Sequence, residues 1–190
     1  RKNSYVGPAW YSKEVDIPSS WKDKEIELKL ERVIWQTAVW VDGKQVEGMQ
    51  ESLVAPHLYD LTGQLTPGKH KITIRVDNRK RYDITAGDMA HAYTNETQIM
   101  WNGIIGEIAL TAKDALSIRN LQAYPDYKNK QVKIRCQINN SGTVTTGTLT
   151  ADIKATTDPA TQIQQRVTLQ PGENLIDLVC PVKDDIQTWN

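Results

Sequence analysis

Hydrophobic and polar residues alternate along most of the chain, a pattern typical of strands that bury one face. The runs Ile26–Leu30 and Ile72–Val76 show the alternation clearly. A helical period is nearly absent, apart from one short helical turn expected within residues 59–65 with Asp60 or Thr62 as its cap. The pattern therefore predicts an all-β chain. Strands are expected at residues 9–17, 25–32, 35–42, 69–77, 106–112, 116–124, 130–139, 147–156, 161–170 and 173–182.

Pairs that contain glycine mark the turns between these strands. Asp42-Gly43 separates two alternating runs by two residues. Both positions of such a turn require a positive φ angle, which Asp tolerates and Gly adopts freely. This pair therefore predicts a two-residue hairpin, and Pro67-Gly68 and Pro171-Gly172 predict two further turns.

The composition changes near Lys113-Asp114. Every tryptophan except Trp189 precedes that point, and the remainder consists of short Thr-, Ile- and Val-rich strands separated by turns. Two β domains are expected: a jelly-roll β-sandwich over residues 1–112 and an immunoglobulin-like β-sandwich over residues 113–190. Because residues 184–190 follow without the last strand or two of such a sandwich, the second domain is expected to be incomplete.

Each domain is expected to bury a core of its own, formed by the inward residues of its strands. The first core is expected to contain Trp10, Ile26, Leu28, Leu30, Val39, Val41, Ile72, Ile74 and Val76. The second is expected to contain Ile134, Cys136, Ile138, Leu149, Ile153, Val167, Leu169, Ile176 and Leu178.

The charges of the chain balance, with 23 Lys and Arg against 23 Asp and Glu in 190 residues. A neutral chain has no general attraction for phosphate backbones or anionic lipids, so nucleic acid and membrane partners are not expected. The basic run Arg79-Lys80-Arg81 is interpreted as a solvated turn. No apolar run approaches the roughly 20 residues of a membrane-spanning helix. These features do not determine the cellular compartment, and a periplasmic or secreted location is slightly favoured.

Cys136 and Cys180 are the two cysteines of the chain. Each occupies an inward position of an alternating run, where cysteine behaves as a small apolar residue. Two buried free thiols are therefore expected, and a disulfide is the alternative in an oxidising compartment.

Six Trp and seven Tyr without any Phe form an unusual aromatic balance. Trp and Tyr suit places where one end of the ring is buried and the other hydrated, as in a carbohydrate site or at a domain seam. The segment Thr97–Gly106 concentrates an indole, amide side chains and two glycines. This composition favours a loop that faces a sugar. The alternative is structural: Trp101 anchors a strand, and Asn102 caps the turn before Gly103.

Several motifs occur in an order and spacing found in one enzyme family. They are Gly7-Pro8-Ala9-Trp10-Tyr11, Trp21, Val39-Trp40-Val41-Asp42-Gly43-Lys44, Pro56–Thr62, Pro67–His70, Ile74–Asn78 and Trp101-Asn102-Gly103-Ile104. In these motifs the chain resembles the N-terminal half of glycoside hydrolase family 2 enzymes, which include β-galactosidases, β-glucuronidases and β-mannosidases. The resemblance is specific from Gly7 to about Ala112 and looser over residues 114–190.

The resemblance implies a jelly-roll sugar-binding domain and an immunoglobulin-like domain that precede a (β/α)8 barrel with two catalytic glutamates. These residues contain no such barrel. Retaining glycosidases hold their two carboxyl groups about 5–5.5 Å apart on one rigid frame, and nothing here supplies that pair. Asn95-Glu96 has the letters of the family's acid/base motif, but it follows Ala90–Thr94 in a loop rather than a buried barrel strand. No residue of the chain is therefore expected to be catalytic.

Four residues are the candidate sugar contacts: His91, Gln98, Trp101 and Asn102. The resemblance implies that a loop of the first domain lies at the rim of the sugar pocket. Amide side chains there can donate to and accept from neighbouring hydroxyls. His57 is interpreted as a packing or hydrogen-bonding residue. No metal or cofactor is expected, because the three histidines are far apart in sequence and no cysteine lies at ligand spacing.

The sequence therefore predicts the non-catalytic N-terminal portion of a retaining exo-β-glycosidase, with a β-galactosidase as the preferred parent enzyme. A β-glucuronidase or a β-mannosidase is the alternative parent. The expected partners are a β-linked carbohydrate and the catalytic barrel, and a homo-oligomer is left open. Two other functional classes are a stand-alone carbohydrate-binding module and a structural sandwich that mediates subunit contact.

Overall fold

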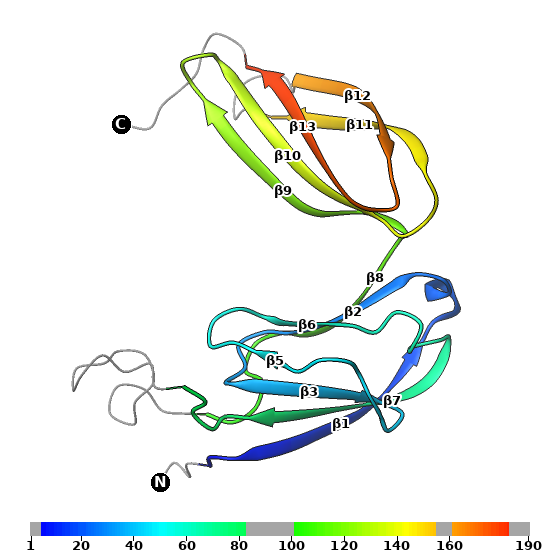
Figure 1. Cartoon of the computed structure of the whole chain (residues 1–190), viewed down its shortest axis with the longest axis vertical. Coiled ribbons are helices and arrows are strands. Elements are labelled where there is room, and N and C mark those ends of the chain that lie inside the picture. Colours follow the sequence, from blue (N-terminus) through cyan, green and yellow to red (C-terminus); the bar gives the residue numbers. More distant parts are fainter. Residues whose placement is uncertain (1–4, 83–100, 155–160, 183–190) are drawn as a thin grey trace, which may run out of the picture. The chain divides into compact units, whose positions relative to one another are not determined.

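The computed structural model describes residues 5–82, 101–154 and 161–182 (Figure 1). Nearly all regular structure in these residues is antiparallel strand, and one 3-10 turn, η1, occupies Ser19–Trp21. The all-β fold expected from the alternating pattern is confirmed. The chain divides into two compact units, Arg1–Lys113 and Asp114–Asn190.

The described part of the first unit contains β1 (Pro8–Ile17), β2 (Glu25–Leu30), β3 (Gln36–Val41), β4 (Lys44–Gln45), β5 (Gln50–Glu51), β6 (His57–Asp60), β7 (Gly68–Asp77) and β8 (Ile108–Lys113). A five-stranded sheet has the order β1-β7-β3-β4, and β5 also pairs with β3. A three-stranded sheet has the order β6-β2-β8. The two sheets form the two layers of a β-sandwich (Figure 1).

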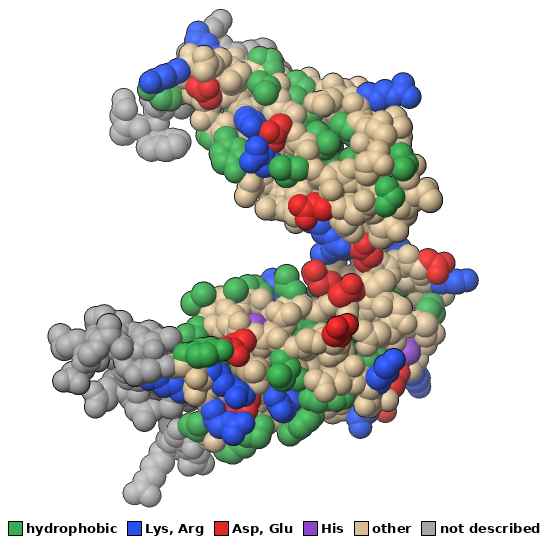
Figure 2. All heavy atoms as spheres, viewed as in Figure 1, with side chains coloured by type: hydrophobic (Ala, Val, Ile, Leu, Met, Phe, Trp, Pro, Cys, Tyr) green, Lys and Arg blue, Asp and Glu red, His purple; other side chains and the backbone are tan. Residues whose placement is uncertain are grey.

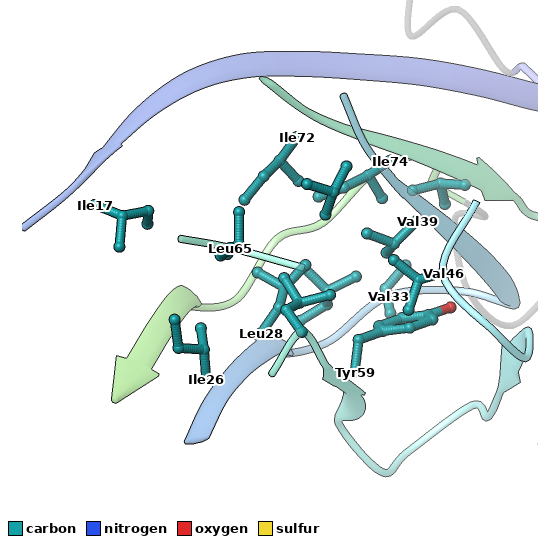
Figure 3. Packing of buried hydrophobic residues seen from close by; sticks show 14 residues of the cluster. Ile17, Ile26, Leu28, Val33, Val39, Val46, Tyr59, Leu65, Ile72 and Ile74 are labelled. Carbon is teal, nitrogen blue, oxygen red and sulfur yellow. The ribbon is translucent and has the colours of Figure 1, made fainter. Parts of the chain in front are cut away.

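The core of the first unit lies between these sheets. Figure 3 shows Ile72 and Ile74 of one layer on the side that faces Leu28 of the other layer. Every expected core residue of this unit is buried except Trp10. The core also takes in residues outside the expected set, namely Ile17, Val33, Val46, Tyr59, Leu61 and Leu65.

The expectation that Trp10 is a core residue is wrong, because its side chain is 58% exposed. Residues of a strand that are an odd number of positions apart point to opposite faces, as Trp10 and Ile17 of β1 do. Ile17 is the one that enters the core. Trp10 therefore lies on the outer face of the sheet. There its ring meets that of Trp40, with ring centroids 4.8 Å apart.

The hairpin expected at Asp42-Gly43 is confirmed. Asp42 has φ 50° and Gly43 has φ 82°, and Val41 pairs with Lys44 across the turn. These are the positive angles that a two-residue hairpin turn requires.

The helical turn expected within residues 59–65 is right only in its second half. Tyr59 and Asp60 belong to β6, which pairs with β2. Tyr59 is buried between the sheets, so tertiary burial overrides the local preference. One turn then follows, in which the Leu65 N–H donates to the Leu61 carbonyl at 3.2 Å.

The described part of the second unit contains β9 (Leu116–Asp126), β10 (Gln131–Asn140), β11 (Thr145–Ile153), β12 (Thr161–Leu169) and β13 (Gly172–Pro181). One sheet has the order β13-β10-β9, and β11 pairs with β12 in another. Side chains of both sheets share one core, so this unit is also a sandwich. Six of the nine expected core residues are buried, and the other three, Leu149, Ile153 and Ile176, pack against the core half-buried.

The two cysteines are free and buried, as expected. Cys136 lies opposite Ile176, whereas Cys180 lies opposite Val132, four residues along β10. Four residues of a strand span about 13 Å. A disulfide needs Cα atoms about 4.4–6.8 Å apart, so this register separates the thiols. Burial raises the pKa of both.

Candidate functional site

Trp101 and Asn102 are the candidate sugar contacts that lie within the described residues, while His91 and Gln98 lie outside them. Trp101 and Asn102 are both half-buried and precede β8. Their surroundings are formed by the end of β7, the start of β1 and the segment Val33–Trp35.

Asn102 takes part in a hydrogen-bond network at the end of β7. Its Nδ2 donates to the Gly7 carbonyl at 2.7 Å and to Asn78 Oδ1 at 3.2 Å. Its Oδ1 accepts a long hydrogen bond of 3.5 Å from the Tyr11 hydroxyl. Both amide hydrogens are therefore used by the protein, and Oδ1 retains spare capacity to accept.

Asn78, which is fully buried, is the centre of this network. Its Oδ1 accepts from the Gly7 N–H at 2.9 Å, and its Nδ2 donates to the carbonyls of Tyr5 (2.8 Å) and Trp101 (3.1 Å). One side chain thus ties together three segments that are far apart in sequence. Asn78 is the last residue of the family motif Ile74–Asn78, but it was not among the four candidate sugar contacts. Its position in that motif, directly after the alternating run of β7, is the signal that could have identified its role.

Gly103 fits closely against Tyr11. It has φ +109°, and a Cβ at this position would lie 2.9 Å from the Tyr11 hydroxyl oxygen. A residue with a side chain would be strained in its backbone and would displace the hydroxyl that reaches Asn102. The positive φ therefore favours glycine here, and a Cβ would also move the Tyr11 hydroxyl.

Trp101 packs against a small cluster formed by Ile34, Trp35 and Leu53. Its indole Nε1 is buried and has no hydrogen-bond partner among the described residues. This packing fits the structural alternative, while the sugar contact of the half-buried indole stays a prediction.

A buried carboxylate lies next to Asn78. Asp77 is fully buried and accepts from Arg79 Nε at 2.9 Å and from Arg81 Nη2 at 3.2 Å. The hydrogen bonds from Arg79 hold the pKa of Asp77 below its usual range. Residues 79–81 are exposed, as the interpretation of a solvated turn expects, and the two arginines also pair with this carboxylate. The physical reason is that a buried carboxylate requires partners of opposite charge.

His57 has the packing and hydrogen-bonding role expected from the sequence. It is buried, and its Nδ1 lies 2.6 Å from Thr37 Oγ1. Thr37 Oγ1 in turn lies 2.8 Å from the Tyr59 hydroxyl. Burial lowers the pKa of His57, which favours the neutral imidazole.

In the part of the chain that the structure describes, no group of three or more His, Cys, Asp or Glu side chains could hold a metal ion. No helix among those residues is both long enough and apolar enough to cross a membrane.

Solved glycosidases share the fold of this chain. Bacteroides uniformis β-glucuronidase 2, solved covalently bound to cyclophellitol-6-carboxylate aziridine, has a TM-score of 0.77 at 21% identity over 97% of this chain and 23% of that one. A candidate β-galactosidase from Bacteroides fragilis has a TM-score of 0.68 at 16% identity over 95% of this chain and 28% of that one. A β-D-mannosidase from Dictyoglomus thermophilum has a TM-score of 0.67 at 14% identity over 92% of this chain and 24% of that one.

The chain therefore spans about a quarter of the length of these enzymes. A comparison with curated protein sequences gave no significant match. The family model described as glycosyl hydrolases family 2, sugar binding domain, matches residues 2–114. This match confirms the resemblance that the motifs indicated. Because it extends over more than half of the sequence, the chain belongs to glycosyl hydrolase family 2 and carries the sugar binding domain of that family.

Proposed function

We propose that this chain is the non-catalytic N-terminal portion of a retaining exo-β-glycosidase. The observation that carries the proposal is the match of residues 2–114 to the family 2 sugar binding domain. The fold of almost the whole chain also corresponds to less than a third of each glycosidase compared. In this proposal, a (β/α)8 barrel outside the chain supplies the two catalytic glutamates, held about 5–5.5 Å apart.

The first unit would contribute to the rim of the sugar pocket through His91, Gln98, Trp101 and Asn102. The network around Asn78 supports this role. Asn78 and Asn102 precede and follow residues 83–100 in the sequence, and their side chains are hydrogen-bonded to each other. Since both Asn102 amide hydrogens are used by the protein, Asn102 is the positioning residue in this proposal. Gln98 is then the amide that would contact sugar hydroxyls.

The second unit, residues 113–190, would be an immunoglobulin-like domain whose β11–β12 sheet takes further strands. Leu121 of β9 supports this proposal. It lies opposite the core residue Cys136, yet it is 58% exposed. A further strand beside β11 would cover this apolar face and would also pair the open edge of the sheet.

For the parent enzyme we retain β-galactosidase as the proposal, with β-glucuronidase and β-mannosidase as alternatives. Structures described by all three activities share the fold of this chain at 14–21% identity. A likeness at that level does not choose among sugars, because residues of the barrel would contact most of the substrate.

Release of nitrophenol from aryl β-galactoside, β-glucuronide and β-mannoside tests the proposal. The full-length protein should hydrolyse one of them, preferably the galactoside, and the 190-residue chain none. A full-length protein that binds sugars but hydrolyses none of the three would favour a stand-alone carbohydrate-binding module. Turnover by the 190-residue chain that Glu96→Gln abolishes would overturn the non-catalytic assignment.

The rim is tested by substitutions in the full-length enzyme. Gln98→Ala should raise KM or lower kcat and leave Tm unchanged. Asn102→Ala should do the same but also lower Tm, because it removes hydrogen bonds to Gly7 and Asn78. Gln164→Ala, on an exposed position of β12, is the matched control. Wild-type kinetics in both Gln98→Ala and Asn102→Ala would rule out the rim.

A further inference from the structure

The outer face of the five-stranded sheet, on the side opposite the core, carries two tryptophans. Trp10 pairs with Arg75, and Trp40 pairs with Thr73. Arg75 and Thr73 alternate along β7 with its buried core residues, so both tryptophans point away from the core. Their ring centroids are 4.8 Å apart and their planes are tilted by 43°. The two indoles, one from β1 and one from β3, therefore meet across β7, which lies between these strands.

Hydrogen-bonding side chains border the two rings. Arg75 lies opposite Trp10 on the same face, and its Nη2 donates to Gln36 Oε1 at 3.2 Å. Ser12 lies opposite Thr73, and Thr73 Oγ1 donates to Ser12 Oγ at 3.4 Å. Gln45 lies opposite Trp40 and is exposed. Figure 2 shows hydrophobic side chains at the surface of the first unit along β1. The surface thus combines flat apolar rings with hydroxyl and amide groups at their edges.

This combination suits a sugar better than other partners. A pyranose of a β-linked chain offers a C–H face for an indole and hydroxyls at its rim for Ser, Thr and Gln side chains. Nucleic acids and anionic lipids would require an excess of positive charge, and the chain is neutral overall.

We propose that this outer face is a second carbohydrate-binding surface, which takes a β-linked oligosaccharide. Trp10 and Trp40 cover C–H faces of the sugar, and Ser12, Thr73 and Gln45 hydrogen-bond to its hydroxyls. The surface is separate from the rim proposed above. Tyr11, which touches Asn102, points to the opposite face of β1 from Trp10. Binding here needs no catalytic barrel and would hold the enzyme on a polysaccharide while another site acts on chain ends.

Isothermal titration of the 190-residue chain with cellotetraose and with β-1,4-galactotetraose tests the proposal. At least one probe should bind saturably at micromolar to millimolar concentration. Trp10→Ala should weaken binding about tenfold, and Thr73→Val, which keeps the side-chain shape, should weaken it several-fold. The control is Tyr127→Ala, which removes an exposed aromatic ring from the second unit and should leave binding unchanged.

Trp10 is largely exposed, so Trp10→Ala should leave Tm close to that of the wild type, which separates lost binding from lost folding. Absence of saturable binding for both tetrasaccharides would overturn the proposal. Equal affinities of wild type and Trp10→Ala would do the same. Analytical ultracentrifugation tests the alternative of self-association. If the chain self-associates and Trp10→Ala abolishes the association, this face is a contact between copies and the proposal is wrong.

Discussion

At the residue scale, His70 shows how one side chain can link two turns. Its Nδ1 lies 2.6 Å from Asp42 Oδ2, and its Nε2 lies 2.8 Å from the Thr66 carbonyl oxygen. Both partners accept hydrogen bonds, so both ring nitrogens must donate, which only the protonated imidazolium does. The hydrogen bond to Asp42 raises the pKa of His70.

Stability should therefore depend on pH through His70. Its folded pKa lies above the unfolded value of about 6.5, so its stabilisation is complete below that pH and is lost as the pH rises through the folded pKa. Tm of the wild type minus Tm of His70→Gln, measured from about pH 5 to about pH 9, should fall as the pH rises. Buried His57 titrates in both proteins and cancels in this difference. A difference independent of pH would contradict the assignment.

Asn78 should be the most costly asparagine to replace. Asn78→Ala would leave the buried Gly7 N–H and the partly buried carbonyls of Tyr5 and Trp101 without this partner. The expected loss in the free energy of unfolding is about 2–4 kcal/mol, measured by urea denaturation. Asn120→Ala, at an exposed position of β9, should change it by less than about 0.5 kcal/mol. Equal effects of the two substitutions would mean that the network contributes little.

At the element scale, the two outer strands of the β13-β10-β9 sheet differ in how their inner faces are covered. Leu178 on β13 is buried in the core, whereas Leu121 on β9 is mostly exposed. Both lie next to β10 and both face the core side, since they pair with Ile134 and Cys136. The β11–β12 sheet therefore covers β13 better than β9.

This difference should appear in the cost of truncation. Leu178→Ala should lower the free energy of unfolding by about 2–5 kcal/mol, because it leaves a cavity in a packed core. Leu121→Ala should lower it by less than about 1 kcal/mol, because little of the side chain leaves water on folding. Urea denaturation measures both. Similar costs for the two leucines would show that the inner face of β9 is covered in solution.

At the scale of the whole molecule, each unit has its own core, and no buried side chain belongs to both clusters among the described residues. Separate cores permit separate unfolding transitions. Leu28→Ala should lower the Tm of the first unit alone, and Leu178→Ala that of the second alone. Calorimetry resolves the two unfolding transitions. Tryptophan fluorescence should report the transition that Leu28→Ala shifts, because every tryptophan except Trp189 lies in the first unit. A single transition shifted by both variants would contradict independent cores.

The sequence alone determined the features that depend on neighbouring residues. Alternation located the long strands, and Asp42-Gly43 identified the hairpin, because strand period and turn angles are local properties. Motif order also identified the family. The inward residues of both cores followed from the same period, with Trp10 as the exception.

Only the tertiary structure decided which long-range contacts form. The alternating pattern predicts that Trp10 and Tyr11 face opposite sides of β1, but it does not determine which of these sides faces the core. Burial of Tyr59 against a distant strand made Tyr59 and Asp60 part of a strand rather than of a helical turn. Asn78 became the centre of the candidate site because folding brings Gly7 and Asn102 to its amide group. These outcomes depend on which apolar surfaces pack against each other and leave water. Those surfaces come from residues that are distant in sequence, so no local pattern determines the pairing.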